Sequence, residues 1–580
     1  MQSPAVTVVG TEVTAMMRGG IRAVTLGAAA VVALMISGAA AAAAAVPVAP
    51  STAIPQLSPA EPGTLGECES LIAFEYDSTV ITGAEIIAAG TLSGVEVGEH
   101  CLVRGHMNER FSEVDGQAYR IGFEMRLPTD WSGRYLYQGN GGLDGNVATA
   151  LGNAGSESGL QLGFAVISSD AGHPGSMGPT FGIDPQARLD YGYQAVGTLT
   201  PMAKALIEAA YGKSPDRSYM TGGSNGGRHT MVGAARYADQ YDGFLAVAPG
   251  FNLPQAAVAQ VWGAQQWVTV ATDAADLNTA LTPAERRVIA DAILARCDGL
   301  DRIEDGMVQD SERCQKAFSI DRDVPTCEVD RDGTCLTAEQ KSVVSDVFAG
   351  ARTSEGEEIY SSFPFDPGLA QGNWAFWKFF ASRSLDPGAI GFIFGTPPDP
   401  SIPASPLTVD IDAVAQSISA TSGIYTESGM EFMTPPDPTR LDTLRERGGK
   451  MIVVHGASDG VFSVDDTGSW YDELDANYGQ KADQFARYFE VPGMGHVRGG
   501  PATDQYEGLT ALIDWVEYGS APDRIDAWVN PANADVPASW SADLSRPLCP
   551  FPSVAQYASG DPDSADSFVC KHSGGGIGRG

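Results

Sequence analysis

Residues 222–226 read Gly-Gly-Ser-Asn-Gly, and no other stretch of the chain restricts its fold as strongly. They fit the pattern G-x-S-x-G, in which a strand enters a tight turn, exposes a serine and continues as a helix. The flanking residues are small because such a turn leaves little room for side chains. Residues 217–221 have the character of a short strand and residues 228–239 that of a helix, so the context favours Ser224 as an exposed nucleophile.

A second match to the same pattern lies at residues 456–460. It follows a convincing strand at 450–455, but the residues after it, Val-Phe-Ser-Val-Asp-Asp, do not begin a helix at the serine. We therefore expect Ser458 to lie in a loop that follows a strand and carries an acidic side chain.

Strand-like and helix-like segments alternate in two separate parts of the chain, which indicates an α/β fold with a parallel sheet. The alternation stops after about residue 257 and resumes at residue 450, and the stretch between is rich in Asp, Pro and aromatic residues. We expect this stretch to be a lid domain inserted between two sheet strands. The expected division is a signal peptide (1–45), a proline-rich linker (46–65), the first part of the core (66–257), the lid (258–445), and the second part of the core with a C-terminal segment (446–580).

The N-terminus has the layout of a secretory signal peptide. Arg18 and Arg22 precede an apolar run at 23–45 that ends in Ala-x-Ala sites, and a proline-rich stretch follows. A retained transmembrane anchor is the alternative, since the run is long enough to span a bilayer. Export with cleavage predicts a secreted protein that has no stable membrane association.

The net charge and the number of cysteines restrict the partners and the cellular compartment that this protein can have. The chain has 36 basic and 72 acidic residues, a net charge of −36, which disfavours binding to nucleic acid and to anionic membranes. Eight cysteines in an exported protein indicate disulfides rather than a metal site. Eight cysteines allow 105 pairings, of which bonding between sequential neighbours is the simplest.

A serine nucleophile needs a base, and the base needs an acid that orients it. In α/β-hydrolases the chain order is serine, acid, histidine. Asp459 follows the strand at 450–455, and His496 follows a strand at 486–491 within Gly-Met-Gly-His. These two are our candidates for acid and base, with Asp465 and Asp466 as alternative acids; the competing interpretation is that they are ordinary polar loop residues.

The oxyanion formed during acyl transfer needs backbone N–H donors. One is expected from Asn225, which follows the nucleophile, and the second from Gly142 in the glycine-rich loop 139–145. The loop could also be only a glycine-rich turn.

Two further patterns suggest binding sites. Asp298, Asp301 and Asp305 are spaced around a turn in a way that suits a calcium ion, although a solvated acidic loop has the same pattern. Aromatic residues crowd the segment 363–394, where most should form the lid core and one or two could stack on an aromatic substrate.

Together these pieces resemble the tannase and feruloyl esterase family of α/β-hydrolases. The resemblance runs over nearly the whole mature chain and is densest in five segments: 181–193, 218–228, 241–254, 445–459 and 491–504.

The resemblance implies roles for particular residues. It implies Ser224, Asp459 and His496 as the triad, with Gly142 and Asn225 as oxyanion donors. It implies structural calcium, and it places His455 and Trp377 at the substrate. The implied calcium ligands are Asp298, Asp301 and Asp305 with the backbone carbonyls of Ile303 and Met307. The family's disulfide pattern implies the local pairs Cys68–Cys101, Cys297–Cys314, Cys327–Cys335 and Cys549–Cys570.

The sequence also departs from the family. Gly223 and Val497 stand where members usually have two cysteines that join the nucleophile and histidine loops. Arg383 is the candidate to hold the free carboxylate of a terephthalate monoester.

We therefore expect a secreted serine carboxylic-ester hydrolase that cleaves small esters of aromatic acids of the feruloyl or galloyl type. A terephthalate monoester is the alternative substrate. A non-catalytic binding protein on the same fold is the alternative of a different class.

Overall fold

The computed structural model describes residues 54–573, which belong to one compact unit. The expected signal peptide (1–45) and the first part of the expected linker (46–53) lie outside the described residues. The rest of the linker joins the core, since β1 (Gly63–Thr64) pairs with β7 (Asp130–Trp131). Within residues 54–573, no helix is both long and apolar enough to cross a membrane.

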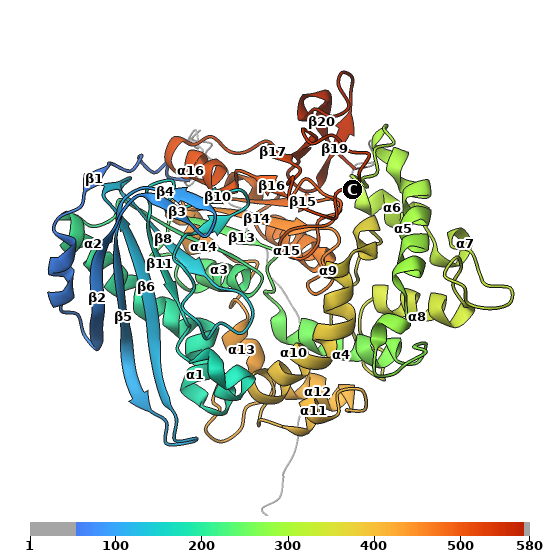
Figure 1. Cartoon of the computed structure of the whole chain (residues 1–580), viewed down its shortest axis with the longest axis horizontal. Helices are drawn as coiled ribbons and strands as arrows, with labels where there is room; N and C mark the ends of the chain where they lie inside the picture. The colour runs from blue at the N-terminus through green and yellow to red at the C-terminus, as the bar shows by residue number, and fades with distance from the viewer. Residues whose placement is uncertain (1–53, 574–580) are drawn as a thin grey trace, which may run out of the picture. The chain divides into compact units, whose positions relative to one another are not determined.

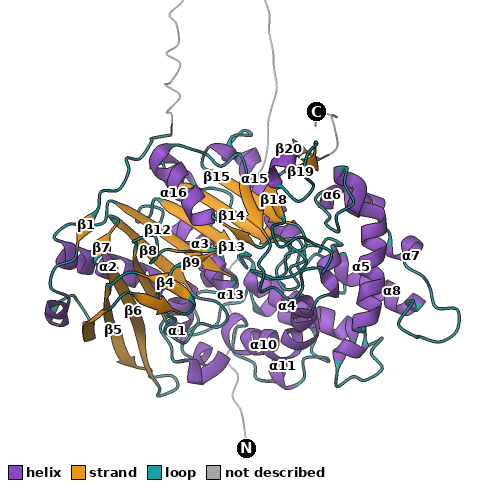
Figure 2. Cartoon of the chain, turned by 45° about the horizontal axis from the view of Figure 1, so that its top comes forward, coloured by secondary structure: helices purple, strands orange, loops and turns teal. Residues whose placement is uncertain are grey.

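A nine-stranded sheet lies at the centre of the unit (Figure 2). Its first six strands in spatial order are parallel, and each of the other three runs antiparallel to the strand before it. In spatial order the strands are β15 (Ala486–Val491), β14 (Lys450–Gly456), β13 (Gly243–Val247), β12 (Arg217–Gly223), β8 (Arg134–Gly139), β11 (Ala165–Ser169), β6 (Ala118–Pro128), β5 (His100–Phe111) and β2 (Thr79–Ile87).

Apolar side chains fill both faces of this sheet because helices cover it on both sides. Every residue of β13 and of β14 is buried. Successive residues of β12 point to opposite faces, so that Tyr219 and Met220 belong to two different hydrophobic clusters. Helices α2 (Ala195–Tyr211), α3 (Asn225–Arg236) and α15 (Val464–Asn477) pack in the cluster of Met220, and α16 (Gly508–Tyr518) packs in that of Tyr219.

The segment between β13 and β14 is long and mostly helical, although these two strands are neighbours in the sheet. Its longer helices gather on the side of the unit away from β2 and β5 (Figure 1). Helix α4 crosses the boundary expected at residue 257, and the whole insertion belongs to the same compact unit as the sheet. Its longer helices are α4 (Leu253–Trp267), α5 (Pro283–Cys297), α8 (Ala338–Phe348) and α10 (Ser382–Ala389).

The eight cysteines form four disulfides, each between sequential neighbours, and none of them is free. The pairs are Cys68–Cys101, Cys297–Cys314, Cys327–Cys335 and Cys549–Cys570. Such bonds persist in oxidising compartments, which fits folding outside the reducing cytoplasm.

Candidate active site

Ser224 lies at the turn between β12 and α3. Its backbone has φ 64° and ψ −126°, a conformation that costs energy in a residue with a side chain. The glycines around it are required by close backbone contacts, since a β-carbon on Gly222 would lie 2.5 Å from the carbonyl carbon of Gly226. A β-carbon on Gly226 would lie 2.2 Å from the carbonyl oxygen of Gly139. The strand, the strained turn and the helix therefore present the serine as the G-x-S-x-G pattern predicts.

Loops that follow three parallel strands, β12, β14 and β15, bring a serine, an aspartate and a histidine together. Nε2 of His496 lies 2.7 Å from Oγ of Ser224, and Nδ1 of His496 lies 2.7 Å from Oδ2 of Asp459. Asp459 follows β14 and His496 follows β15, at the carboxyl ends of these strands, where open α/β sheets form their sites. This arrangement can move a proton from the serine to the imidazole while the carboxylate stabilises the resulting charge.

The environment of Asp459 keeps it ionised. Burial alone would raise the pKa of this carboxyl group, but the charge of His496 and hydrogen bonds from His455 and His496 outweigh burial and hold the pKa well below its ordinary value. Its Oδ1 atom accepts hydrogen bonds from the backbone N–H groups of Val461, at 2.9 Å, and Phe462, at 3.1 Å. The carboxylate is thus fixed in place on both oxygens.

The two alternative acids, Asp465 and Asp466, form hydrogen bonds with residues outside the triad. Asp465 accepts a hydrogen bond of 2.6 Å from the Ser362 hydroxyl, and Asp466 accepts hydrogen bonds from Nδ2 of Asn252. Burial raises the pKa of Asp465 to about 6 and that of Asp466 to about 7. Asp459 is the acid that contacts the histidine.

The two segments that carry the expected oxyanion donors both lie next to the nucleophile turn. Asn225 is the first residue of α3, where the backbone N–H has no acceptor within the helix. Loop 139–145 lies against the turn, since a β-carbon on Gly141 would be 3.9 Å from the β-carbon of Ser224. Gly142, the next residue in this loop, has φ 62° and would have no atom within 4 Å of an added β-carbon, so it borders open space.

A buried polar network joins these two donors. Asp144 from the loop accepts a hydrogen bond of 2.8 Å from Nδ2 of Asn225, and its carboxylate lies 2.9 Å from Nε2 of His229. Nε of Arg228 donates to Oδ1 of Asn225 at 2.6 Å. The loop that carries Gly142 is therefore tied to the start of α3 through side chains.

Side chains of the insertion contact the catalytic loops. Asn373 Oδ1 accepts a hydrogen bond of 3.0 Å from the backbone N–H of His496, and the Trp377 ring lies edge-on against the His496 ring at 4.7 Å. The buried carboxylate of Asp366 accepts hydrogen bonds from the Ser458 hydroxyl and, at 3.2 Å, from the backbone N–H of Gly493. Asp366 therefore links the loop of the acid to the loop of the histidine.

Comparison with known proteins agrees with this geometry. The family described as tannase and feruloyl esterase matches residues 101–571. The mono(2-hydroxyethyl) terephthalate hydrolase of Piscinibacter sakaiensis is 36% identical over 529 residues, which cover 83% of this chain and 86% of that protein. The chain belongs to the tannase and feruloyl esterase family.

Other members are similar over most of the chain. A probable feruloyl esterase B-1 of Neosartorya fischeri is 29% identical over 419 residues, covering 69% of this chain and 75% of that one. The crystal structure of feruloyl esterase B from Aspergillus oryzae superposes with a TM-score of 0.70 at 22% identity, covering 87% of this chain and 99% of that one. The likeness in structure confirms the predicted α/β-hydrolase fold. As a member of this family, the chain is a carboxylic ester hydrolase.

His455 lies behind the acid rather than at an open surface. Its side chain is wholly buried, with Nε2 at 3.2 Å from Asp459 Oδ2 and Nδ1 at 2.8 Å from Thr467 Oγ1. Both ring nitrogens are therefore occupied, and neither is free to contact a substrate as the family resemblance implied. Trp377, the other residue implied at the substrate, is half-buried beside His496.

The expected calcium loop follows α5. Asp298 accepts hydrogen bonds from the backbone N–H groups of Asp305 and Gly306, whereas one buried oxygen of Asp301 has no partner. Burial, and then the charge of Asp305, raise the pKa of Asp301 to about 7. The unpartnered oxygen fits a cation, but Asp305 Oδ2 is engaged by Arg546 at 2.5 Å.

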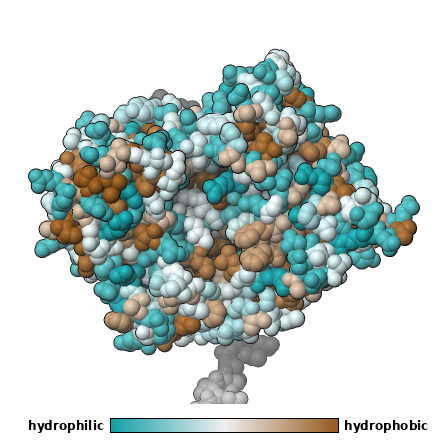
Figure 3. Space-filling view, viewed as in Figure 1, coloured by the Kyte–Doolittle hydropathy of each residue, from teal (hydrophilic) through white to brown (hydrophobic). Residues whose placement is uncertain are grey.

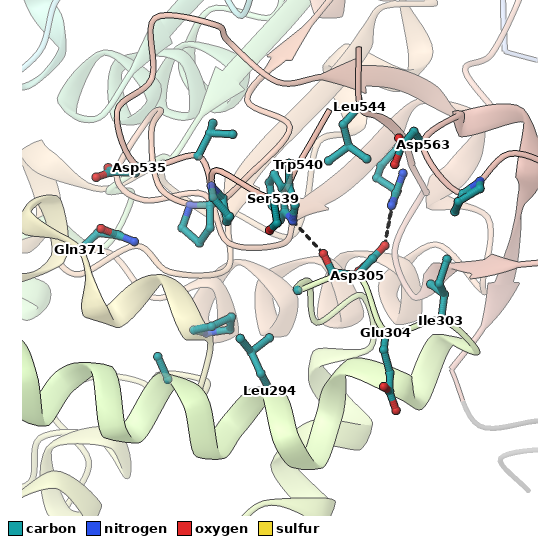
Figure 4. Close-up of a pocket in the computed structure, with 18 of the residues that line it drawn as sticks. Leu294, Ile303, Glu304, Asp305, Gln371, Asp535, Ser539, Trp540, Leu544 and Asp563 are labelled. Atoms are coloured by element: carbon teal, nitrogen blue, oxygen red, sulfur yellow. Dashed lines mark hydrogen bonds and ion pairs between the residues drawn. The ribbon is translucent and has the colours of Figure 1, made fainter. Parts of the chain in front are cut away.

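The five implied ligands are close in the chain without converging through their side chains. Among residues 54–573, no three His, Cys, Asp or Glu side chains are placed to hold a metal ion together. Ile303 and Met307 therefore enter the proposed site only through their backbone carbonyls. Asp305 and Ile303 also line an open cavity of about 820 Å³ that includes Trp540 and that no triad residue lines (Figure 4).

Sequence patterns did not point to Asp366, Asn373, Asp144 or Thr467. Asp366, Asn373 and Asp144 act through contacts between segments that are distant in the chain, and Thr467 lies on a helix that carries no motif. One signal existed for Asp366: the second G-x-S-x-G match contains Ser458, whose hydroxyl donates to Asp366. Arg383, the candidate for a substrate carboxylate, donates from Nη1 to the carbonyl of Ala275 at 2.8 Å.

Proposed function

We propose that this enzyme hydrolyses esters of aromatic carboxylic acids, with feruloyl or galloyl esters as the substrate class. The observation that carries the proposal is an aromatic surface next to the catalytic histidine. Trp377 packs against His496, and Phe376 and Phe380, from the same π-helical segment η7 (Phe376–Ala381), are 46% and 60% exposed. An aromatic acyl group gains apolar burial and ring stacking on such a surface.

The arrangement of this surface suits a substrate that enters from solvent. The Phe376 and Phe380 rings stack with centroids 5.4 Å apart, and the edge of Phe376 meets Trp377 at 5.1 Å. Hydrophobic side chains gather beside a hollow in the face shown in Figure 3, over the region where Figure 1 draws α9 (Gly372–Ala375). Segment η7 follows α9 directly.

The triad supports an acyl-enzyme mechanism. Ser224 Oγ attacks the ester carbonyl as its proton passes to Nε2 of His496, and Asp459 stabilises the imidazolium. The backbone N–H groups of Asn225 and Gly142 stabilise the oxyanion. His496 then protonates the leaving alcohol, and a water molecule activated by the same imidazole hydrolyses the acyl-enzyme to release the acid and restore Ser224.

Replacement of the nucleophile tests this function. Wild-type protein is expected to hydrolyse a p-nitrophenyl ester, and Ser224→Ala is expected to lose at least about a thousandfold in kcat. Ser458→Ala removes the serine of the other motif and should keep turnover within about tenfold. Absence of turnover by wild type, or loss in Ser458→Ala equal to that in Ser224→Ala, would contradict the assignment.

A terephthalate monoester is the second candidate substrate, because a hydrolase of that monoester is the relative with 36% identity. Kinetics with methyl ferulate, methyl gallate and the terephthalate monoester would rank the candidates. A kcat/KM for the monoester above those of both methyl esters would replace the first proposal by the second.

We also propose that the enzyme is exported and holds a structural calcium ion. Export is supported by the signal-like N-terminus and the four disulfides. Calcium is supported by the unpartnered buried oxygen of Asp301 in a loop that offers carboxylates and backbone carbonyls. The residues that would hold it are Asp298, Asp301 and Asp305 with the carbonyls of Ile303 and Met307, where it would supply positive charge to a buried acidic loop.

A further inference from the structure

Two histidines, and not one, contact the catalytic acid. Oδ2 of Asp459 lies 2.7 Å from Nδ1 of His496 and 3.2 Å from Nε2 of His455. His455 is the sixth residue of β14, four positions before Asp459, and its side chain has no exposure to solvent. Thr467, on α15, lies on the far side of the His455 ring, with its hydroxyl oxygen 2.8 Å from Nδ1.

The chemistry of these partners fixes the tautomer of His455. An ionised carboxylate can only accept hydrogen bonds, so Nε2 of His455 carries the proton and donates to Asp459. In the neutral ring Nδ1 is then an acceptor, and the Thr467 hydroxyl is the donor that it faces. At each of these two contacts, one group therefore donates the hydrogen bond and the other accepts it.

We propose that Thr467 and His455 are positioning residues for the catalytic acid. They extend the triad into a row of five hydrogen-bonded side chains: Thr467, His455, Asp459, His496 and Ser224. The threonine donates to Nδ1 and so holds the His455 ring in place, and the donation from Nε2 of His455 helps to orient the carboxylate of Asp459 toward His496. The inference rests on the proposed hydrolase function and deepens it.

The second donor also affects charge. Oδ2 of Asp459 shares its negative charge between two N–H groups, so less of it is available to stabilise the imidazolium of His496. Loss of the His455 donation should therefore strengthen the interaction of Asp459 with the imidazolium of His496. It should also loosen the carboxylate, because one of the four hydrogen bonds that hold it would be lost.

Other titratable groups lie near Asp459 and must stay constant in a test. Lys378 of the insertion interacts with the charge of Asp459, and burial lowers the pKa of this lysine to about 7. The phenol oxygen of Tyr360 accepts a hydrogen bond from the backbone N–H of Ser463, and burial, then the charge of Asp466 and that of Asp459, raise the pKa of this phenol. Substitution at Thr467 leaves all three of these side chains in place.

Thr467→Val and Thr467→Ser form a matched pair of variants. Valine keeps the shape of threonine without a hydroxyl, and serine keeps the hydroxyl. We expect Thr467→Val to lower kcat on a p-nitrophenyl ester by about tenfold with KM unchanged, and to move the acid limb of kcat/KM to higher pH. Thr467→Ser should keep most of the wild-type kcat and of the wild-type pH profile. A raised KM with unchanged kcat would mean that His455 contacts substrate, and a lowered melting temperature with unchanged kinetics would mean a structural role only; either result would overturn the proposal.

A spectroscopic measurement decides the tautomer without any turnover. The chain has seven histidines, so ¹⁵N-histidine NMR of the Ser224→Ala protein can resolve the His455 ring. We expect protonation at Nε2 in that protein, and a changed ¹⁵N chemical shift of Nδ1, which loses its hydrogen-bond donor, when Thr467→Val is added. Protonation at Nδ1 in the parent, or no change with valine, would overturn the proposal. Failure of the proposed function would instead show as a wild-type protein that turns over no ester, whatever the NMR result.

Discussion

Val497 packs against the α-carbon of Gly223, so that the residue after the catalytic histidine touches the residue before the nucleophile. A β-carbon on Gly223 would lie 3.0 Å from Cγ1 and 3.4 Å from Cγ2 of Val497. Val497 itself has φ 68°, an uncommon conformation for a β-branched residue. The two positions at which the sequence departs from the family's cysteines are therefore in direct contact, and an apolar contact joins the two loops there.

This contact predicts a rescue experiment. Gly223→Ala should crowd Val497, displace the histidine loop and lower kcat by about tenfold, with a loss of stability of about 1–2 kcal/mol. Adding Val497→Ala should recover most of kcat, because it removes the atoms that clash. Gly222→Ala is the control: its β-carbon would meet the backbone of Gly226, so Val497→Ala should not rescue it. Equal rescue of both variants would show that the Val497 contact is not the cause.

Asp366 predicts that the insertion holds the catalytic loops in place. Asp366→Ala leaves the Ser458 hydroxyl and the Gly493 N–H without their acceptor, so kcat should fall by about tenfold or more. Circular dichroism melting and kcat/KM of the folded protein would be measured together. Ser458→Ala removes only one of these bonds and should have the smaller effect. An Asp366→Ala protein with full kcat would show that the two loops keep their geometry without this link.

Replacement of Asp466 by asparagine should stabilise the protein relative to wild type by an amount that depends on pH. Burial raises the pKa of this carboxyl group to about 7, above the ordinary value of 3.8. Between these two values the folded state keeps a proton that the unfolded state has lost, so the contribution to stability falls as pH rises from about 4 to 7. Asp466→Asn removes the titrating group, and with it this loss of stability at higher pH. The free energy of unfolding of the variant minus that of wild type should therefore be larger at pH 8 than at pH 5, by about 2 kcal/mol.

The control for this pH effect is the exposed Asp543. Chemical denaturation at pH 5 and pH 8 should give the same difference from wild type for Asp543→Asn. If Asp466→Asn also shows no difference between the two pH values, the carboxyl group titrates normally in the folded protein.

Calcium removal tests the acidic loop after α5. Dialysis against EGTA followed by calcium-free buffer should lower the melting temperature by several degrees, and added Ca²⁺ should restore it. Asp301→Asn should melt at the temperature of the depleted protein and respond little to Ca²⁺. A wild-type melting temperature that is insensitive to EGTA, with no metal found by elemental analysis, would reject the site.

The fold could be predicted from the chain because its signals are local. The strand, glycine turn and helix around Ser224 are encoded within about twenty residues, and the order of strands and helices indicates the α/β sheet. The cysteines bond to sequential neighbours, so spacing alone suggested their pairing. The serine, acid and histidine were chosen from their chain order and from the loops in which they lie.

The tertiary structure decided which side chains surround these residues. The residues around His455 in the chain are the same whether its side chain faces a substrate or the acid. Only the position of α15 puts Thr467 behind its ring. Asp366 lies 92 positions before Ser458, so no periodicity connects them. Local backbone preferences specify a turn or a strand, whereas a hydrogen bond between distant segments depends on how the whole sheet and the insertion pack. The sequence by itself therefore determined the nucleophile turn and the order of the catalytic groups, and the packing of the insertion and of α15 decided what holds them in position.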